Sequence, residues 1–311
     1  MEPNTKNPLV SIIVNCYNGE EYLHEALTSI SNQTYNNWEV IFWDNGSNDK
    51  TKIIATTFSK KIKYFYSEVN EPLGVARNKA LERCKGKYIT FLDSDDIYLS
   101  NSLMKLVSSI ETEKVALSYG GVEYIDSFGN TIDSVKPKDK SGDLFGQLLN
   151  QFDIHVPSVI IDNEVIKQNN YYINNKLECS EEYNLFMKIA LNHKISSISK
   201  VISKYRILSD SLSVKTYKRH GLERRITLNE LIELKPVIQY KFKQELKEAF
   251  ARSEYYDSRY FLLRNRKKEG IKTLSKVMFV NYKYFSLFLL ALLPKIIWSK
   301  IHKIKNKRFI N

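Results

Sequence analysis

Three carboxylates stand within four positions, at Asp93, Asp95 and Asp96, directly after an apolar run at residues 87–92. The β-branched and aromatic residues of that run are typical of a buried strand. Unpaired carboxylates inside a sheet would be costly to desolvate, so we expect them at the exposed carboxyl end of the strand. Carboxylate oxygens in such a crevice suit a hard divalent cation that also binds substrate phosphates. The alternative is an acidic start to the next helix.

Strand and helix patterns alternate four times in the first 110 residues. We expect strands at 9–15, 38–43, 62–66 and 87–92, and helices at 20–32, 50–58, 75–84 and 99–110. This alternation predicts βαβ crossovers and an α/β, Rossmann-like, mostly parallel sheet flanked by helices. The polar breaks follow the strands, so Asn15, Tyr17, Asp44 and the acids after residue 92 should meet at one edge of the sheet. Neither a G-x-G-x-x-G nor a Walker A loop is present, so a metal would have to offset phosphate charge.

The pattern is less regular after residue 114. We expect strands at 115–119, 122–125, 155–161 and 195–205, a polar hairpin or loop at 126–142, and a helix opening at 179. Beyond residue 215 the chain reads as helical, basic and rich in tyrosine. We therefore predict a sheet-containing domain at residues 1–215 and a helical region at residues 216–311.

Composition limits the partners. The net charge of +12 suits phosphate-rich partners or an anionic membrane surface. Nucleic acid is not expected, because no recognised binding module is present and the predicted crevice is acidic. The three cysteines lie far apart and suggest no disulfide framework, and the first residues lack a signal-peptide pattern, so we expect a cytoplasmic protein.

Six segments together resemble a family 2 glycosyltransferase of the GT-A fold. The resemblance covers about residues 8–215, and it is carried by Val10–Asn18, Asp44–Thr51, Gly74–Asn78, Gly86–Asp96, Glu181–Tyr183 and Tyr205–Arg206. Each segment alone is a weak signal, but six in this order at family-like spacing are specific.

The resemblance implies roles for residues of the nucleotide-sugar site. In proteins of this kind the position of Asp44 binds the nucleobase and that of Tyr17 supplies a ring contact. Arg77 would lie near the base or phosphates, although a surface ion pair on its own helix is the plainer alternative. Asn15 and Arg206 would complete the donor-binding set.

The resemblance also implies a metal and a base. Asp95 would bind Mn²⁺ or Mg²⁺, with Asp93 beside the ribose or the metal, and Asp96 would merely begin the next helix. An inverting transfer needs a general base, for which Glu182 is the first candidate and Glu181 the second. Glutamate stands here where the family usually has aspartate, and both acids could instead complement a helix dipole.

Two other positions depart from the family or carry no expected role. Leu208 stands where a histidine often follows the Tyr-Arg pair, so a histidine contact to the diphosphate is not expected. We expect His155 and His193 to be ordinary polar residues.

The C-terminal stretch 277–308 is apolar and aromatic, then basic. Its longest apolar run is about nine residues with Ser286 as the one polar position, short of the ~20 needed to cross a bilayer. An amphipathic anchor on anionic lipid fits this order of residues, and a core helix with a solvated basic tail is the alternative.

The sequence therefore predicts a metal-dependent, inverting glycosyltransferase. It would move a sugar from a nucleotide-sugar, most simply a UDP-sugar, to a glycan or lipid-linked acceptor in surface polysaccharide biosynthesis. It would work in the cytoplasm, peripherally at the inner face of the membrane. The alternative is a non-catalytic, nucleotide-binding or scaffold subunit of a glycan assembly complex.

Overall fold

The computed structural model describes residues 7–294 and residue 297, which form two compact units. The first unit contains the chain up to Leu144, Asp153–Leu177 and Lys188–Ile207. The second contains Phe145–Phe152, Glu178–Met187 and the described residues from Leu208 onward. The units interleave along the chain, and the last boundary between them falls between Ile207 and Leu208.

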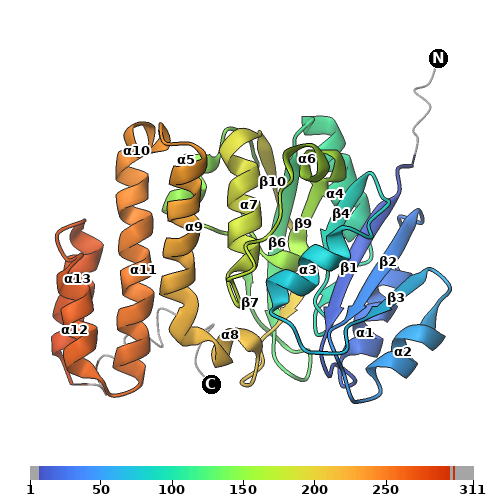
Figure 1. The fold of residues 1–311 in the computed structure, drawn as a ribbon, viewed down its shortest axis with the longest axis horizontal. Coiled ribbons are helices and arrows are strands. Elements are labelled where there is room, and N and C mark those ends of the chain that lie inside the picture. Colours follow the sequence, from blue (N-terminus) through green and yellow to red (C-terminus); the bar gives the residue numbers. More distant parts are fainter. Residues whose placement is uncertain (1–6, 295–296, 298–311) are drawn as a thin grey trace. The chain divides into compact units, whose positions relative to one another are not determined.

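The first unit is built on a ten-stranded sheet in the order β3-β2-β1-β4-β9-β6-β10-β5, with β7 beside β6 and β8 beside β10 (Figure 1). The strands are β1 (Val10–Cys16), β2 (Trp38–Asp44), β3 (Ile62–Tyr66), β4 (Tyr88–Phe91), β5 (Ile97–Tyr98), β6 (Leu117–Ile125), β7 (Thr131–Val135), β8 (Lys140–Gly142), β9 (Val159–Asp162) and β10 (Ile195–Arg206). β1 to β4 are mutually parallel, β6 is parallel to β10, and β9 is antiparallel to β4 and β6. Six strands thus share one direction, which confirms the mostly parallel sheet.

Helices cover both faces of this sheet, because alternate residues of β1 point to opposite sides. Ile12 belongs to a buried core shared with α1 (Leu23–Ser31), α2 (Thr51–Phe58) and α4 (Ser102–Glu113). Ile13 points to the other face, in register with Phe91 of β4. The guanidinium of Arg77, from α3 (Leu73–Leu81), lies 5.8 Å from the centre of the Phe91 ring, so α3 covers that second face. The four helices expected in the first 110 residues are confirmed to within a few residues.

Strand β6 corrects one expectation. The sequence predicts two strands, at 115–119 and 122–125, but the structure has one continuous strand through Gly120 and Gly121. A Cβ on Gly120 would lie 2.2 Å from the side chain of Ile202 in β10, and a Cβ on Gly121 would lie 2.1 Å from the carbonyl oxygen of Val135 in β7. The glycine pair therefore allows close approach of the neighbouring strands and forms no turn.

The second unit is helical, as expected for the C-terminal extension (Figure 1). Its helices are α5 (Phe145–Asn150), the first part of α7 (Glu181–Asn192), α8 (Leu212–Lys215), α9 (His220–Leu234), α10 (Ile238–Lys241), α11 (Lys243–Leu263), α12 (Lys267–Ser275) and α13 (Tyr282–Leu292). The long helix α11 packs against α5, α9 and α12. A buried core joins the later helices, formed by Ala251, Leu262, Leu274, Val277, Tyr284 and Ala291.

Helix α13 carries the described part of the apolar C-terminal stretch. Tyr284 is buried in the core of the second unit, and its hydroxyl donates a 2.8 Å hydrogen bond to Glu248. Phe279, Tyr282 and Phe285 are exposed nearby. Within the described residues we find no helix with the length and apolar character needed to cross a bilayer. The predicted basic segment, residues 300–308, lies outside the described residues.

Candidate donor and catalytic site

The acids that follow β4 lie in the loop between β4 and β5, at the carboxyl end of β4. Asp93 and Asp95 are partly exposed there. Oδ1 of Asp93 accepts a 2.7 Å hydrogen bond from Nη2 of Arg77, whose side chain is buried. The ion pair of Arg77 thus joins α3 to the acidic loop, whereas the alternative read from the sequence was a surface pair within its own helix. A buried guanidinium needs such a partner, so the pair holds both side chains in place.

Asp96 differs from the expected role. It is buried and followed by β5, and α4 begins only at Ser102, so it is not the first acid of that helix. Its Oδ1 accepts a 2.8 Å hydrogen bond from the backbone N–H of Arg206, whereas its Oδ2 has no hydrogen-bond partner among the described residues. Burial, followed by the charges of Asp95 and Asp93, raises the pKa of the Asp96 carboxyl well above its ordinary value. The third acid is therefore an internal support of the loop.

Arg206, at the end of β10, connects this loop to two other segments. Its Nε donates to the carbonyl oxygen of Asp95 at 2.9 Å, and its Nη1 donates to the carbonyl oxygens of Asp126 and Ser127 at 3.2 and 3.1 Å. Its Nη2 donates to Glu25 of α1 at 2.6 Å. Contact with the donor remains a prediction for Arg206. Its buried side chain already has a positioning role, because it donates hydrogen bonds to two loops and to helix α1.

Asp44 ends β2 at the same edge of the sheet as the acidic loop. It is fully buried, and its Oδ1 accepts a 2.8 Å hydrogen bond from the backbone N–H of Ser47. Its Oδ2 accepts a 2.7 Å bond from the hydroxyl of Tyr64. Burial, together with the bond to Asp44, raises the pKa of Tyr64, so this phenol stays a neutral donor. Tyr17 is half-exposed beyond the end of β1, where an aromatic ring is open to a ligand.

Asn15 lies one position before the end of β1. Its side chain is buried, yet neither its Oδ1 nor its Nδ2 has a hydrogen-bond partner among the described residues. It pairs in register with Trp43, whose Nε1 also lacks a partner in the described part of the chain. Buried polar atoms without partners are rare, and they mark places where a ligand or water completes the bonding.

The two candidate bases stand at the start of α7, in the second unit. Glu181 is buried, whereas Glu182 is partly exposed. A general base has to reach the hydroxyl of a substrate, so the exposure favours Glu182 over Glu181. The structure thus brings six of the predicted residues together at one edge of the first unit, namely Asn15, Asp44, Arg77, Asp93, Asp95 and Arg206.

The reading of the sequence missed Glu223 of α9. Its buried carboxylate accepts hydrogen bonds from three consecutive backbone N–H groups, those of Glu178, Cys179 and Ser180, at 3.0–3.1 Å. Nε of Arg219 donates a further bond at 2.8 Å. Burial alone would raise the pKa of Glu223, but the bonds from Arg219 and the backbone outweigh it and hold the pKa below its ordinary value. This carboxylate therefore fixes the segment that leads into α7 and its candidate base.

The donor set fits a metal that shares its ligands with a substrate. Among the described residues no group of three or more histidine, cysteine or acidic side chains could form a complete metal cage. Asp93 and Asp95 offer partly exposed carboxylates, and the unpartnered Oδ2 of Asp96 lies in the same loop. Mg²⁺ and ions like it commonly take one or two carboxylates and complete their shell with phosphate oxygens and water. The acids of this loop therefore suit a diphosphate-bridging ion.

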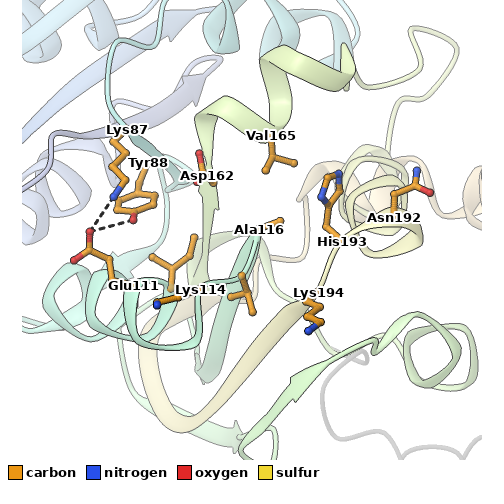
Figure 2. A pocket seen from close by; sticks show the side chains of 12 residues that line it. Lys87, Tyr88, Glu111, Lys114, Ala116, Asp162, Val165, Asn192, His193 and Lys194 are labelled. Atoms are coloured by element: carbon orange, nitrogen blue, oxygen red, sulfur yellow. Dashed lines mark hydrogen bonds and ion pairs between the residues drawn. The ribbon is translucent and has the colours of Figure 1, made fainter.

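A separate pocket of about 680 Å³ lies on the first unit (Figure 2). It is lined by residues at the amino ends of β4, β6 and β10, including Tyr88, Ala116 and Lys194. Glu111, which also lines the pocket, accepts hydrogen bonds from Lys87 and Tyr88 at 3.1 and 3.2 Å, drawn as dashed lines in Figure 2. Because the acidic loop follows the carboxyl end of β4, this pocket lies at the opposite edge of the sheet and is not part of the donor site.

Comparison with solved structures agrees with this fold. S. aureus TarS, crystallised in complex with UDP-GlcNAc, superposes with a TM-score of 0.68 at 20% identity, covering 97% of this chain and 93% of that one. The mannosyltransferase PcManGT from Pyrobaculum calidifontis, in complex with GDP-Man and Mn²⁺, gives a TM-score of 0.59 at 15% identity, covering 98% of this chain and 89% of that one. These likenesses confirm the GT-A fold.

Comparison of sequences gives the family. The chain is 32% identical over 213 residues to the UDP-Glc:alpha-D-GlcNAc-diphosphoundecaprenol beta-1,3-glucosyltransferase WfgD of Escherichia coli, which covers 68% of this chain and 81% of WfgD. The model of glycosyl transferase family 2 matches residues 11–189, more than half of the chain. The chain therefore belongs to glycosyl transferase family 2.

Proposed function

We propose that the chain is a metal-dependent, inverting transferase that moves a sugar from a UDP-sugar to a lipid-linked glycan acceptor in surface polysaccharide biosynthesis. The observation that carries this proposal is the loop after β4, where Asp93 and Asp95 are partly exposed and Asp93 pairs with the buried guanidinium of Arg77. The acids suit a divalent cation, and the arginine suits an anionic donor. The uridine donor is supported by TarS, which was crystallised with UDP-GlcNAc, and the lipid-linked acceptor by WfgD.

The residues proposed to bind the donor belong to the first unit. The carboxylate of Asp44 would accept a hydrogen bond from an N–H of the base, with the hydroxyl of Tyr64 holding its second oxygen in place. Tyr17 would contribute ring contact, and the open amide of Asn15 would complete its bonds with the donor or a water. Asp93, held by Arg77, and Asp95 would hold Mn²⁺ or Mg²⁺, which stabilises the charge of the departing diphosphate when it is bound.

The residue proposed to activate the acceptor belongs to α7. Glu182 would take the proton of the acceptor hydroxyl while the oxygen attacks the anomeric carbon, opposite to the departing diphosphate. The bond from that carbon to the diphosphate breaks as the new glycosidic bond forms, so the configuration is inverted. The exposure of Glu182 permits this contact, whereas the buried Glu181 would need a rearrangement to reach a substrate. We place this work at the cytoplasmic face of a membrane, where a lipid-linked acceptor is accessible.

A panel of nucleotide-sugars tests this function. Thermal unfolding of the full chain is measured with UDP-, GDP-, dTDP- and CMP-sugars, each in the presence of Mn²⁺ and again with a chelator. We expect a UDP-sugar to raise the melting temperature with Mn²⁺ and to lose most of that effect with the chelator. Nuclear magnetic resonance of the product of that donor then reads the anomeric configuration. Binding of no nucleotide-sugar under either condition would overturn the proposal.

A further inference from the structure

The guanidinium of Arg224, on α9, lies among aromatic rings of the second unit. Its Cζ is 4.1 Å from the centre of the Tyr183 ring, 5.3 Å from that of Tyr256 and 5.7 Å from that of Phe152. Tyr183 is itself buried, and Phe152 meets it edge-on at 4.9 Å. Ring faces attract a cation and exclude water from one side of it. The rings therefore fix the guanidinium and leave its hydrogen bonding to other groups.

Those hydrogen bonds are not made within the described chain. An arginine side chain has five N–H donors, and within the described residues Arg224 contacts rings and interacts with the charge of Glu182, with no hydrogen bond or ion pair to a carboxylate. Two nearby arginines differ, namely Arg219 just before α9 and Arg225 on that helix. Nε of Arg219 donates to Glu223 at 2.8 Å, and Nη2 of Arg225 donates to Asp257 at 2.7 Å. Glu223 of α9 and Asp257 of α11 thus pair with two nearby arginines and not with Arg224, which is partly exposed.

This arginine lies within electrostatic range of the candidate base. Tyr183, on which the guanidinium is stacked, directly follows Glu182 on α7. Burial opposes the charged form of Arg224, but Tyr256, Tyr183 and the charge of Glu182 favour it, and the pKa stays above its ordinary value. A permanent cation with open donors therefore lies near the group that would receive the proton of the acceptor.

We propose that Arg224 and its ring cage form the site that binds a phosphate group of the acceptor. Arginine pairs with phosphate oxygens through two parallel N–H bonds, and a guanidinium held on an aromatic ring is already oriented for them. A phosphate bound at this point would place the sugar that it carries near Glu182. The site rests on the proposed function, since it concerns the acceptor of the same transfer.

Binding of inorganic phosphate tests the site directly. Phosphate is titrated into the full chain, saturated with UDP so that the donor site is filled, and followed by phosphorus nuclear magnetic resonance. The variant is Arg224→Gln, and the matched control is Arg225→Gln, which removes the same charge one position away on the same helix. We expect wild type and control to bind phosphate equally and Arg224→Gln to bind it about tenfold to hundredfold more weakly. Arg224→Lys should retain part of the binding, because it keeps the charge and loses the fork.

Two competitors separate the possible sources of the phosphate. Farnesyl diphosphate represents a lipid-linked diphosphate, and glycerophosphoglycerol represents a phosphodiester of a glycan. The site is supported if either competitor displaces phosphate from wild type and does not do so in Arg224→Gln. The competitor that binds more tightly identifies the source of the phosphate group. The proposal would be overturned if neither competitor displaced phosphate from wild type. It would also be overturned if all variants bound phosphate equally, or if wild type did not bind phosphate.

Failure of this inference is distinguishable from failure of the proposed function. UDP binding and the slow hydrolysis of a UDP-sugar without acceptor do not require the phosphate site. If both are retained in Arg224→Gln, the fold and the donor site are intact, and the phosphate titration alone decides. If UDP-sugars are neither bound nor hydrolysed by wild type, the proposed function itself is wrong.

Discussion

The backbone N–H of Arg206 donates a 2.8 Å hydrogen bond to the buried carboxylate of Asp96, across 110 positions of sequence. The side chain of the same arginine donates to the carbonyl oxygen of Asp95 at 2.9 Å. The end of β10 therefore sets the path of the acidic loop after β4. The geometry of the proposed metal ligands depends on a residue that need not touch the metal.

Replacing Arg206 by lysine should disturb this loop. A lysine ammonium cannot reproduce the fork that reaches Asp95, Asp126, Ser127 and Glu25. We expect the free energy of unfolding to fall by about 1.5–3 kcal/mol and the Mn²⁺-supported affinity for UDP to fall about tenfold. Chemical denaturation and calorimetric titration measure the two effects. Lys200→Met, at an exposed position of the same strand, is the control, and unchanged UDP affinity in Arg206→Lys would refute the positioning role.

Glu223→Gln should slow turnover without weakening the binding of the donor. The substitution removes the charge that holds the three N–H groups ahead of α7, so the candidate base loses its fixed position. A misplaced catalytic group can cost up to about a hundredfold in rate, and we expect kcat to fall about tenfold to hundredfold with the donor KM unchanged. Glu233→Gln, exposed on the same helix, is the control. Equal loss of kcat in both variants, or a rise in donor KM alone, would count against this role.

The same carboxylate predicts a pH dependence of stability. The pKa of Glu223 in the folded chain lies below its ordinary value of 4.5, so its ionised form stabilises the fold above about pH 4.5. That contribution is lost as the pH falls through the lowered pKa. We expect the free energy of unfolding to decline below about pH 4.5 more steeply in wild type than in Glu223→Gln. Parallel curves for the two proteins would show that Glu223 is not held in its ionised form.

Contact with membranes can be tested without removing the core of the second unit. Truncation before Val277 would delete Tyr284, which is buried, so substitution of exposed residues is the cleaner design. Phe279→Ser and Tyr282→Ser should reduce flotation with anionic vesicles, because exposed aromatic side chains supply interfacial binding. Phe128→Ser, equally exposed but in the first unit, is the control. Equal flotation of all these proteins would exclude this surface as the anchor.

The first 110 residues were predictable because their signals are local. The β-branched run of β1 and the polar breaks after each strand follow from strand propensity and from turn chemistry, and both are visible within a few positions of sequence. Asp93 and Asp95 could be placed at the carboxyl end of β4 on the same grounds, since charges are excluded from a buried strand.

The parts that failed depend on distant contacts. Asp96 resembles a helix-start acid in sequence, and only the end of β10 shows that it is an internal acceptor. The carboxylate of Glu223 binds backbone groups about 45 positions away, and backbone N–H groups leave no trace in side-chain patterns. Gly120 and Gly121 suggested a break because the close approach of β7 and β10 is a tertiary fact. Arg224 is one basic residue among many in the sequence, because the contacts that pair Arg225 with Asp257 and surround Arg224 with rings are tertiary.

The most direct test compares two variants with wild type in a transfer assay that uses the preferred UDP-sugar. Turnover and donor affinity are measured with Mn²⁺ for wild type, Asp95→Ala and Glu182→Gln. A metal-dependent transferase with Glu182 as its base predicts that both variants lose turnover by at least about a hundredfold, and that only Asp95→Ala loses Mn²⁺-supported donor binding. Wild-type turnover in Glu182→Gln, or donor turnover in wild type that is unaffected by a chelator, would contradict that assignment.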